Sequence, residues 1–203
     1  MKLILLRHGQ TPSNVAGALD TAPPGPGLTE LGFLQAAAAA RTLADESPVA
    51  LFASNQLRAQ QTAAPLAQAR SLDVGILPGL REIAAGDLEM ATDADSVHRY
   101  IGTLIAWISG DLTQRVPGGP NGSEFLDRYD EAVSHIVERV LADAGPDGSA
   151  VAVSHGAAIR AWAARRAVNA ADAMAADAGT PTAIIAPAAS RHRHLDNTGA
   201  ITL

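Results

Sequence analysis

The chain has 203 residues, a formal net charge of −6 and no cysteine. The acidic balance disfavours binding to nucleic acid or to an anionic membrane surface, because a polyanion meets a repulsive average field. The absence of cysteine excludes disulfides, thiolate metal sites and a cysteine nucleophile.

Apolar residues make up 47% of the chain, which is typical of a globular protein. The length allows one substantial core, and we expect a single domain over residues 1–203. The apolar run at the N-terminus is too short for a signal peptide, and no stretch reaches the roughly 18 apolar residues of a membrane span. We therefore expect a cytoplasmic protein with no membrane or nucleic-acid partner.

Short aliphatic runs alternate with helical patterns along the chain. The runs have the length and composition of strands that are buried on both faces, as in a parallel sheet. The alternation predicts an α/β fold, a three-layer α/β/α sandwich with a mainly parallel central sheet. In chain order we expect a strand at Leu3–Leu6, a helix from Thr29, a strand at Val49–Ala53, a helix after Ser54, a strand at Val74–Leu77, a helix over Ser123–Ala142, a strand at Ala150–Val153 and a helix after His155.

Three segments do not follow this alternation. Residues 17–27 form a loop rich in Pro and Gly, and residues 191–196 are polar and include His192 and His194. The spacing of these two histidines would suit a metal site, but no cluster of cysteine or carboxylate residues accompanies them, and a polar loop is favoured. Residues 89–122 contain a predicted helix near 97–108 and a PGGPNG turn. We expect this segment to be a lid or insert over the sheet edge.

Charged side chains follow the predicted strands. Arg7 and His8 follow the first strand, Arg58 lies one turn into the helix after the second, Glu82 follows the third, and His155 follows the last. Ligands of open α/β sheets bind at the carboxyl ends of the strands, so we expect these five residues at one rim. Taken alone, the Arg7–His8 pair is also explained as a solvated strand end, and Glu82 as surface charge.

These residue types suit phosphoryl chemistry. Two guanidiniums can hold a phosphate through bidentate hydrogen bonds and stabilise the charge of the transferring group. One imidazole can attack phosphorus while the second stabilises the anion, and a carboxyl group can give a proton to the leaving oxygen. The chain has no Walker-type phosphate loop, no G-x-G-x-x-G after a strand and no H-E-x-x-H helix. Phosphoryl chemistry would therefore depend on the Arg and His residues themselves.

Five short motifs, taken in order, resemble the histidine phosphatase superfamily, the phosphoglycerate mutase-like phosphatases with an RHG motif. They are LLRHGQT, SNQLRAQQTA, PGLREIAAGDLE, GSEF and VAVSHGAAIR. The resemblance implies the same three-layer fold, a small phosphorylated metabolite as substrate, and hydrolysis through a phosphohistidine without a metal or organic cofactor. It also implies the role of nucleophile for His8, of phosphate pocket for Arg7, Arg58 and His155, of proton donor for Glu82, and of a border to the phosphate or substrate for Gln10 and Asn14.

Departures from the family pattern leave alternatives open. The ERHYG-type stretch of true mutases is absent, and Leu88, Glu89 and Met90 follow Asp87 in place of the family's usual residues. Asp87 and Glu89 are therefore reserve candidates for the acid. A phosphatase is favoured over a mutase and over a non-catalytic module that binds a phosphorylated ligand. The sequence does not decide the substrate, the existence of a homodimer, or whether His98 or residues 89–122 contact the substrate.

Overall fold

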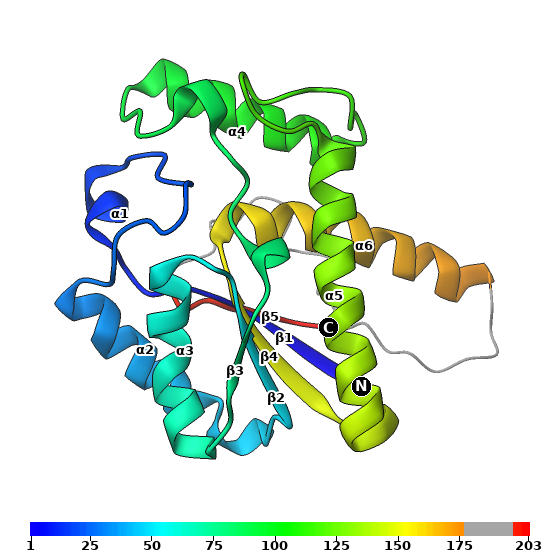
Figure 1. The fold of residues 1–203 in the computed structure, drawn as a ribbon. Helices are drawn as coiled ribbons and strands as arrows, with labels where there is room; N and C mark the ends of the chain where they lie inside the picture. The colour runs from blue at the N-terminus through cyan, green and yellow to red at the C-terminus, as the bar shows by residue number, and fades with distance from the viewer. Residues whose placement is uncertain (177–196) are drawn as a thin grey trace.

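A five-stranded sheet forms the centre of the computed structural model, which describes residues 1–176 and 197–203 (Figure 1). The strands lie in the order β3-β2-β4-β1-β5. Strands β1 to β4 run parallel to one another, and β5 pairs antiparallel with β1 at one edge. Their bounds are β1 Lys2–Arg7, β2 Ala50–Ala53, β3 Val74–Ile76, β4 Ser149–Ser154 and β5 Ala200–Thr202.

Helices cover both faces of the sheet and produce three layers (Figure 1). Helices α2 and α3 pack on one face, α5 and α6 pack on the other, and α4 lies past the carboxyl ends of the strands (Figure 1). The predicted three-layer α/β fold with a mainly parallel sheet is confirmed. The bounds are α1 Pro12–Ala16, α2 Glu30–Thr42, α3 Leu57–Arg70, α4 Ala94–Ser109, α5 Gly122–Ala144 and α6 Gly156–Ala176, with short 3-10 helices at Ala44–Glu46, Pro78–Leu80, Gly86–Leu88 and Gly145–Asp147.

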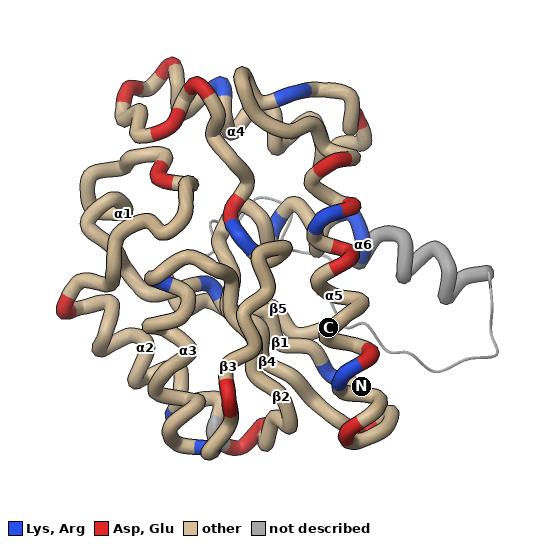
Figure 2. Tube along the Cα trace, in the orientation of Figure 1, with Lys and Arg blue, Asp and Glu red and all other residues tan. Residues whose placement is uncertain are grey.

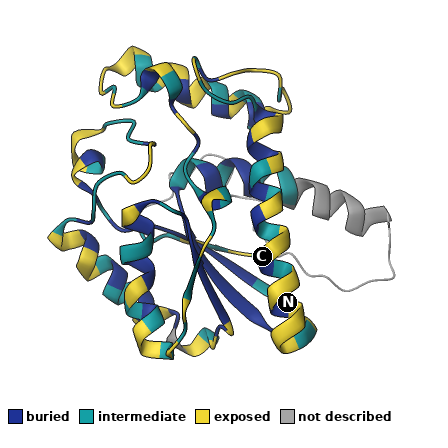
Figure 3. Ribbon diagram, in the orientation of Figure 1, coloured by how far each residue is buried: buried dark blue, intermediate teal, exposed yellow. Residues whose placement is uncertain are grey.

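Strands β1, β2 and β4 are buried on both faces, as their aliphatic composition predicts, whereas the edge strands β3 and β5 are partly exposed (Figure 3). Successive side chains of a strand point to opposite faces, so Leu3 and Leu5 join the core under α5 and α6, whereas Ile4 and Leu6 join the core under α2 and α3. The two cores differ in composition. The helices contribute mostly small side chains to the α2–α3 core and large aromatic ones to the other core, the latter being Trp107, Phe125, Tyr129 and Trp162.

Capping residues fix where the main helices begin. The Thr29 side chain accepts a hydrogen bond from the backbone N–H of Gly32 and starts α2, as the sequence predicts. Helix α5 starts with a capping box, in which Asn121 and Glu124 each accept from the other's backbone N–H. These caps fix where the loops before α2 and α5 end and where the helices begin.

The structure differs from the prediction at β5 and at the start of α4. Strand β5 was not predicted, because its three residues form a strand only through pairing with β1. Helix α4 begins at Ala94, earlier than expected, because the Asp93 side chain caps it through the N–H of Ser96. The polar segment with His192 and His194 lies outside the described residues. Within residues 1–176 and 197–203, no helix is long and apolar enough to cross a membrane.

Candidate active site

Two adjacent parallel strands bring the two predicted active-site histidines together. The β1–β4 register places Arg7 beside Ser154, so His8 and His155 each follow directly after a paired residue. The backbone N–H of His8 donates to the carbonyl of Ser154 at 3.1 Å. The two imidazole rings lie 5.0 Å apart between centroids, at an angle of 54°. The sheet itself therefore fixes the spacing of this pair.

The ring of His8 is oriented by the residue that follows it. His8 Nδ1 lies 2.7 Å from the carbonyl oxygen of Gly9, which can only accept, so Nδ1 carries the proton and Nε2 carries the lone pair. Gly9 has no room for a side chain, because a Cβ there would lie 2.6 Å from the carbonyl oxygen of Gly32. Burial lowers the pKa of His8 well below its usual value, and the charges of Arg58 and Arg7 lower it further. The imidazole is therefore neutral and aligned.

His155 lies beside His8 in a completely buried position. Its Nε2 is 2.7 Å from the hydroxyl oxygen of Ser54, and its Nδ1 is buried without a hydrogen-bond partner in the described structure. Burial, followed by the proximity of His8 and Arg58, lowers the pKa of His155 well below its usual value. The ring does not line the cavity described below, but it lies next to the ring of His8.

Two buried guanidiniums accompany the histidines. Arg7 is 8% exposed and Arg58 is 3% exposed. Arg58 Nη2 donates to the carbonyl oxygen of Asp20 at 2.9 Å, and Nη1 lies 3.6 Å from the Asp20 carboxylate. Burial lowers the pKa of Arg58, while the carboxylates of Glu82, Asp20 and Glu89 act in the opposite direction. Cationic side chains held this way are ready to bind an anion.

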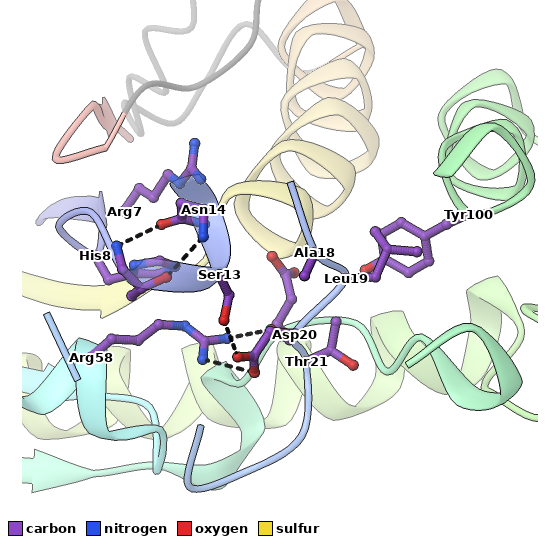
Figure 4. A pocket seen from close by; sticks show the side chains of 12 residues that line it. Arg7, His8, Ser13, Asn14, Ala18, Leu19, Asp20, Thr21, Arg58 and Tyr100 are labelled. Carbon is purple, nitrogen blue, oxygen red and sulfur yellow. Dashed lines mark hydrogen bonds and ion pairs between the residues drawn. The ribbon is translucent and has the colours of Figure 1, made fainter. Parts of the chain in front are cut away.

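A polar cavity of about 90 Å³ opens beside His8 (Figure 4). Its lining residues include some at the end of β1, in α1, in the loop after α1, in α3 and in α4. Ser13, Asp20 and Tyr100 line it although the sequence did not single them out. Asp20 lies in the loop rich in Pro and Gly, where no local pattern indicates a site residue. Tyr100 is a buried residue of α4, and its hydroxyl donates to the carbonyl of Ile83 at 2.8 Å. The complete lining is Arg7, His8, Thr11, Ser13, Asn14, Ala18, Leu19, Asp20, Thr21, Arg58, Glu82 and Tyr100.

The predicted proton donor Glu82 lines the cavity and also caps a helix. Its carboxylate accepts backbone N–H groups from Ala158 at 2.8 Å, from Ile83 at 2.9 Å and from Ala157 at 3.2 Å. Ala157 and Ala158 belong to the first turn of α6, whose free N–H groups attract an anion. The reserve candidates do not line the cavity: Asp87 is exposed, and the Glu89 carboxylate binds the loop after α1.

The structure separates the two residues predicted to border the substrate. Asn14 lines the cavity, and its Oδ1 accepts from the Thr11 N–H and from Asn197 Nδ2, both at 3.1 Å. Gln10 lies outside the lining, where its Oε1 accepts from the Thr29 hydroxyl at 3.0 Å. His98 is exposed on α4 and does not line the cavity either.

A family model matches residues 3–186, and its description is the histidine phosphatase superfamily, branch 1. The chain belongs to this superfamily. The match covers the motifs that contain Arg7, His8, Arg58, Glu82 and His155, which the structure gathers at the carboxyl edge of the sheet. In the described part of the chain, no group of three or more His, Cys, Asp or Glu residues could hold a metal ion.

Several superfamily members are similar to the chain over most of its length. Glucosyl-3-phosphoglycerate phosphatase of Mycobacterium tuberculosis is 35% identical, over 79% of this chain and 72% of its own. A solved structure of the mycobacterial enzyme in complex with VO3 matches with a TM-score of 0.67 and 33% identity, over 81% of this chain and 80% of that chain. Adenosylcobalamin/alpha-ribazole phosphatase of Salmonella typhimurium is 35% identical, over 67% of each chain.

A further relative is much longer than the matched region. PE-PGRS family protein PE_PGRS11 of Mycobacterium tuberculosis is 42% identical over 75% of this chain, but the match spans only 28% of that protein. The region similar to this chain is thus one part of that longer protein.

Proposed function

We propose that the chain is a phosphatase that hydrolyses a small phosphomonoester through a phosphohistidine at His8. The observation that carries the proposal is the placement of this imidazole: its Nδ1 lies 2.7 Å from the Gly9 carbonyl oxygen, and the ring lines a cavity shared with Arg7 and Arg58. A nucleophile needs an available lone pair and an electrophile held within reach. The geometry supplies the first, and the two guanidiniums supply the second by binding the phosphate.

In the first step, the lone pair of His8 Nε2 attacks phosphorus and the bond from phosphorus to the ester oxygen breaks. The leaving oxygen takes its proton from Glu82 and departs as an alcohol. The imidazole keeps its Nδ1 proton and becomes a phosphorylated cation, which the Gly9 carbonyl stabilises. Arg7 and Arg58 stabilise the charge on the phosphoryl oxygens during the transfer.

In the second step, a water molecule attacks the phosphorus of the intermediate. Its proton passes to the Glu82 carboxylate, the P–N bond breaks, and the electron pair returns to Nε2. Inorganic phosphate leaves, and His8 and Glu82 return to their starting states. The same carboxyl group thus acts first as acid and then as base, and no metal or organic cofactor takes part in the proposed cycle.

The substrate of this reaction is a small phosphorylated metabolite. The relatives named above are phosphatases of glucosyl-3-phosphoglycerate and of alpha-ribazole compounds, which are small molecules. Acidic residues gather on the segment that leads into α4 (Figure 2). Because α4 contributes Tyr100, residues 89–122 are proposed to close one side of the site. The cytoplasmic location and the single-domain organisation stay predictions from the sequence, and the existence of a homodimer stays open.

The test is to trap the intermediate. The protein is mixed with p-nitrophenyl phosphate, quenched within milliseconds in base, and analysed by mass spectrometry for phosphate on His8. We expect an acid-labile, base-stable phosphohistidine at His8, present in a His135→Ala control and absent in His8→Ala. Turnover without any such species would overturn the proposal. With a phosphorylated sugar acid as substrate, release of inorganic phosphate indicates a phosphatase, whereas an isomeric phosphate ester indicates a mutase.

A further inference from the structure

The Glu89 carboxylate binds the loop after α1 through three donors. Oε1 accepts the backbone N–H of Thr21 at 2.7 Å and that of Ala22 at 2.9 Å, and Oε2 accepts the Thr21 hydroxyl. Glu89 is 68 residues away from Thr21 in the sequence. It does not line the cavity, so its carboxylate has no direct access to a phosphate bound there.

Thr21 is held by two further segments. Its hydroxyl accepts the backbone N–H of Ala85 at 2.8 Å, and its carbonyl accepts Nε2 of Gln56 at 3.0 Å. The Gln56 side chain is fully buried, and its Oε1 accepts the backbone N–H of Glu82 at 3.0 Å. Thr21 therefore joins the loop after α1 to the start of α3 and to the segment that contains Glu82.

Backbone pairing continues this junction on the side of α4. The N–H of Leu19 donates to the carbonyl of Ala91, and the N–H of Met90 donates to the carbonyl of Leu19, both at 3.0 Å. Asp20, which lies between Leu19 and Thr21, is thus fixed at its two neighbours. Its position in the cavity wall depends on Glu89 and on the backbone next to Glu89.

Asp20 is the residue that holds Arg58. Its carbonyl and its carboxylate both face the guanidinium, and its Oδ2 accepts the Ser13 hydroxyl at 2.5 Å (Figure 4). The Arg58 side chain is 3% exposed and the Asp20 side chain is 10% exposed, so water does not compete strongly for these groups. A shift of the Asp20 backbone would therefore move the guanidinium.

We propose that Glu89 is a positioning residue for the phosphate site and acts through Thr21 and Asp20 on Arg58. The inference rests on the proposed function, because Arg58 matters only if the cavity binds phosphate. Three donors meet at one side chain, and only a group with two acceptor oxygens satisfies all of them. Loss of the carboxylate leaves two backbone N–H groups unpaired and releases the segment that carries Asp20.

The experiment compares Glu89→Ala, Glu89→Gln and a control, Glu138→Ala, which changes an exposed carboxylate on α5. Because a small misplacement of a binding group can cost on the order of 100-fold, we expect kcat/KM for p-nitrophenyl phosphate to fall by about that factor in Glu89→Ala. The inhibition constant of inorganic phosphate should rise roughly tenfold. Glu89→Gln keeps an acceptor for both N–H groups and should recover most of the loss, and Glu138→Ala should match the wild type.

A double-mutant cycle with Arg58 separates positioning from general stability. In an Arg58→Gln background, Glu89→Ala should change kcat/KM by less than about twofold, since the residue through which Glu89 acts is gone. An equal loss in both backgrounds, or wild-type kinetics in Glu89→Ala, overturns the inference. If Glu89→Ala fails to unfold cooperatively, Thr21→Val takes its place in the same cycle under the same criteria; it removes the hydroxyl that donates to Glu89 and accepts from Ala85.

The outcome also separates this inference from the proposed function. A wild-type protein that forms phosphohistidine, together with Glu89 variants that bind phosphate normally, overturns the role of Glu89 alone. A wild-type protein that neither hydrolyses p-nitrophenyl phosphate nor binds inorganic phosphate overturns both.

Discussion

The cavity wall has two halves that are held in different ways. The strand half consists of Arg7 and His8 at the end of β1, and the parallel ladder fixes it next to His155, which follows β4. The loop half consists of Asp20 and Thr21 after α1, and hydrogen bonds to segments far apart in the sequence fix it. One half depends on the sheet, and the other depends on a few side chains.

We therefore expect the strand half to act in phosphoryl transfer and the loop half to act in substrate binding. The proposed nucleophile His8 needs a defined ring orientation, and the strand half provides it through the Gly9 carbonyl and the paired backbone. The proposed phosphate ligand Arg58 is held by Asp20, which lies in a loop, and loops tolerate change more readily than a buried ladder. Substitutions in the strand half should therefore abolish turnover, while substitutions in the loop half should change affinity.

The sharpest test of the strand half is His8→Ala. Without the imidazole no phosphohistidine can form, and we expect kcat to fall by roughly 10⁶-fold, as for removal of other covalent nucleophiles. Steady-state hydrolysis of p-nitrophenyl phosphate measures the loss, and inorganic phosphate binding by calorimetry serves as the control for an intact pocket. Residual activity within tenfold of the wild type would show that another group attacks phosphorus.

Glu82 lies where the halves meet, and Glu82→Gln distinguishes proton transfer from helix capping. We expect kcat to fall by roughly 10²–10⁴-fold for an alkyl phosphate, whose leaving oxygen needs a proton, but much less for p-nitrophenyl phosphate, whose leaving group departs as an anion. The measurement is kcat for both substrates. An equal loss for both would assign Glu82 to the α6 cap it forms with Ala157 and Ala158.

Arg58→Gln tests whether the cation that the loop half holds controls the charge state of the strand half. Burial and then the Arg58 charge lower the pKa of His8, which keeps the ring neutral in mildly acidic solution. Removing this cation removes one cause of the lowering, so the pKa of His8 rises and the acidic limb of the pH profile of kcat/KM moves to higher pH. We also expect kcat/KM to fall by about 10²–10³-fold. An unmoved acidic limb would contradict electrostatic coupling between the halves.

Met90→Gly should have the smallest effect. Met90 has φ 63°, a left-handed conformation that disfavours a side chain, and its side chain is 57% exposed. We expect Met90→Gly to raise the free energy of unfolding by about 0.5 kcal/mol, because the relief of backbone strain outweighs the larger entropy that glycine gives the unfolded chain. Urea denaturation measures it. Ser71→Gly, at φ 54° after α3, is the matched control away from the cavity, and only Met90→Gly should alter KM.

The strand half could be predicted from the sequence because its signals are local. An aliphatic run predicts a buried strand, and the residue after a parallel strand lies at the carboxyl edge, so Arg7, His8 and His155 were found together. Their spacing needed no knowledge of the loops. Strand β5 shows the limit of this reasoning, because three residues carry no pattern of their own until β1 pairs with them.

The loop half could not be predicted because its contacts depend on backbone N–H groups, which every residue type except proline has. Nothing in the local pattern of Glu89 indicates that it binds Thr21, and its acidic character suggested a reserve proton donor instead. Gln10 was expected near the substrate by family resemblance, but the Thr29 hydroxyl at the start of α2 holds its side chain outside the cavity. These placements emerge only when distant segments meet.

The lining of the cavity has a consequence for engineering. The two buried guanidiniums in this lining attract the phosphoryl group of a substrate rather than the alcohol part. We expect the alcohol part to contact the uncharged lining residues, which include Ala18 and Leu19. A library that varies these two positions could redirect the protein to new esters while the residues that transfer phosphate stay unchanged.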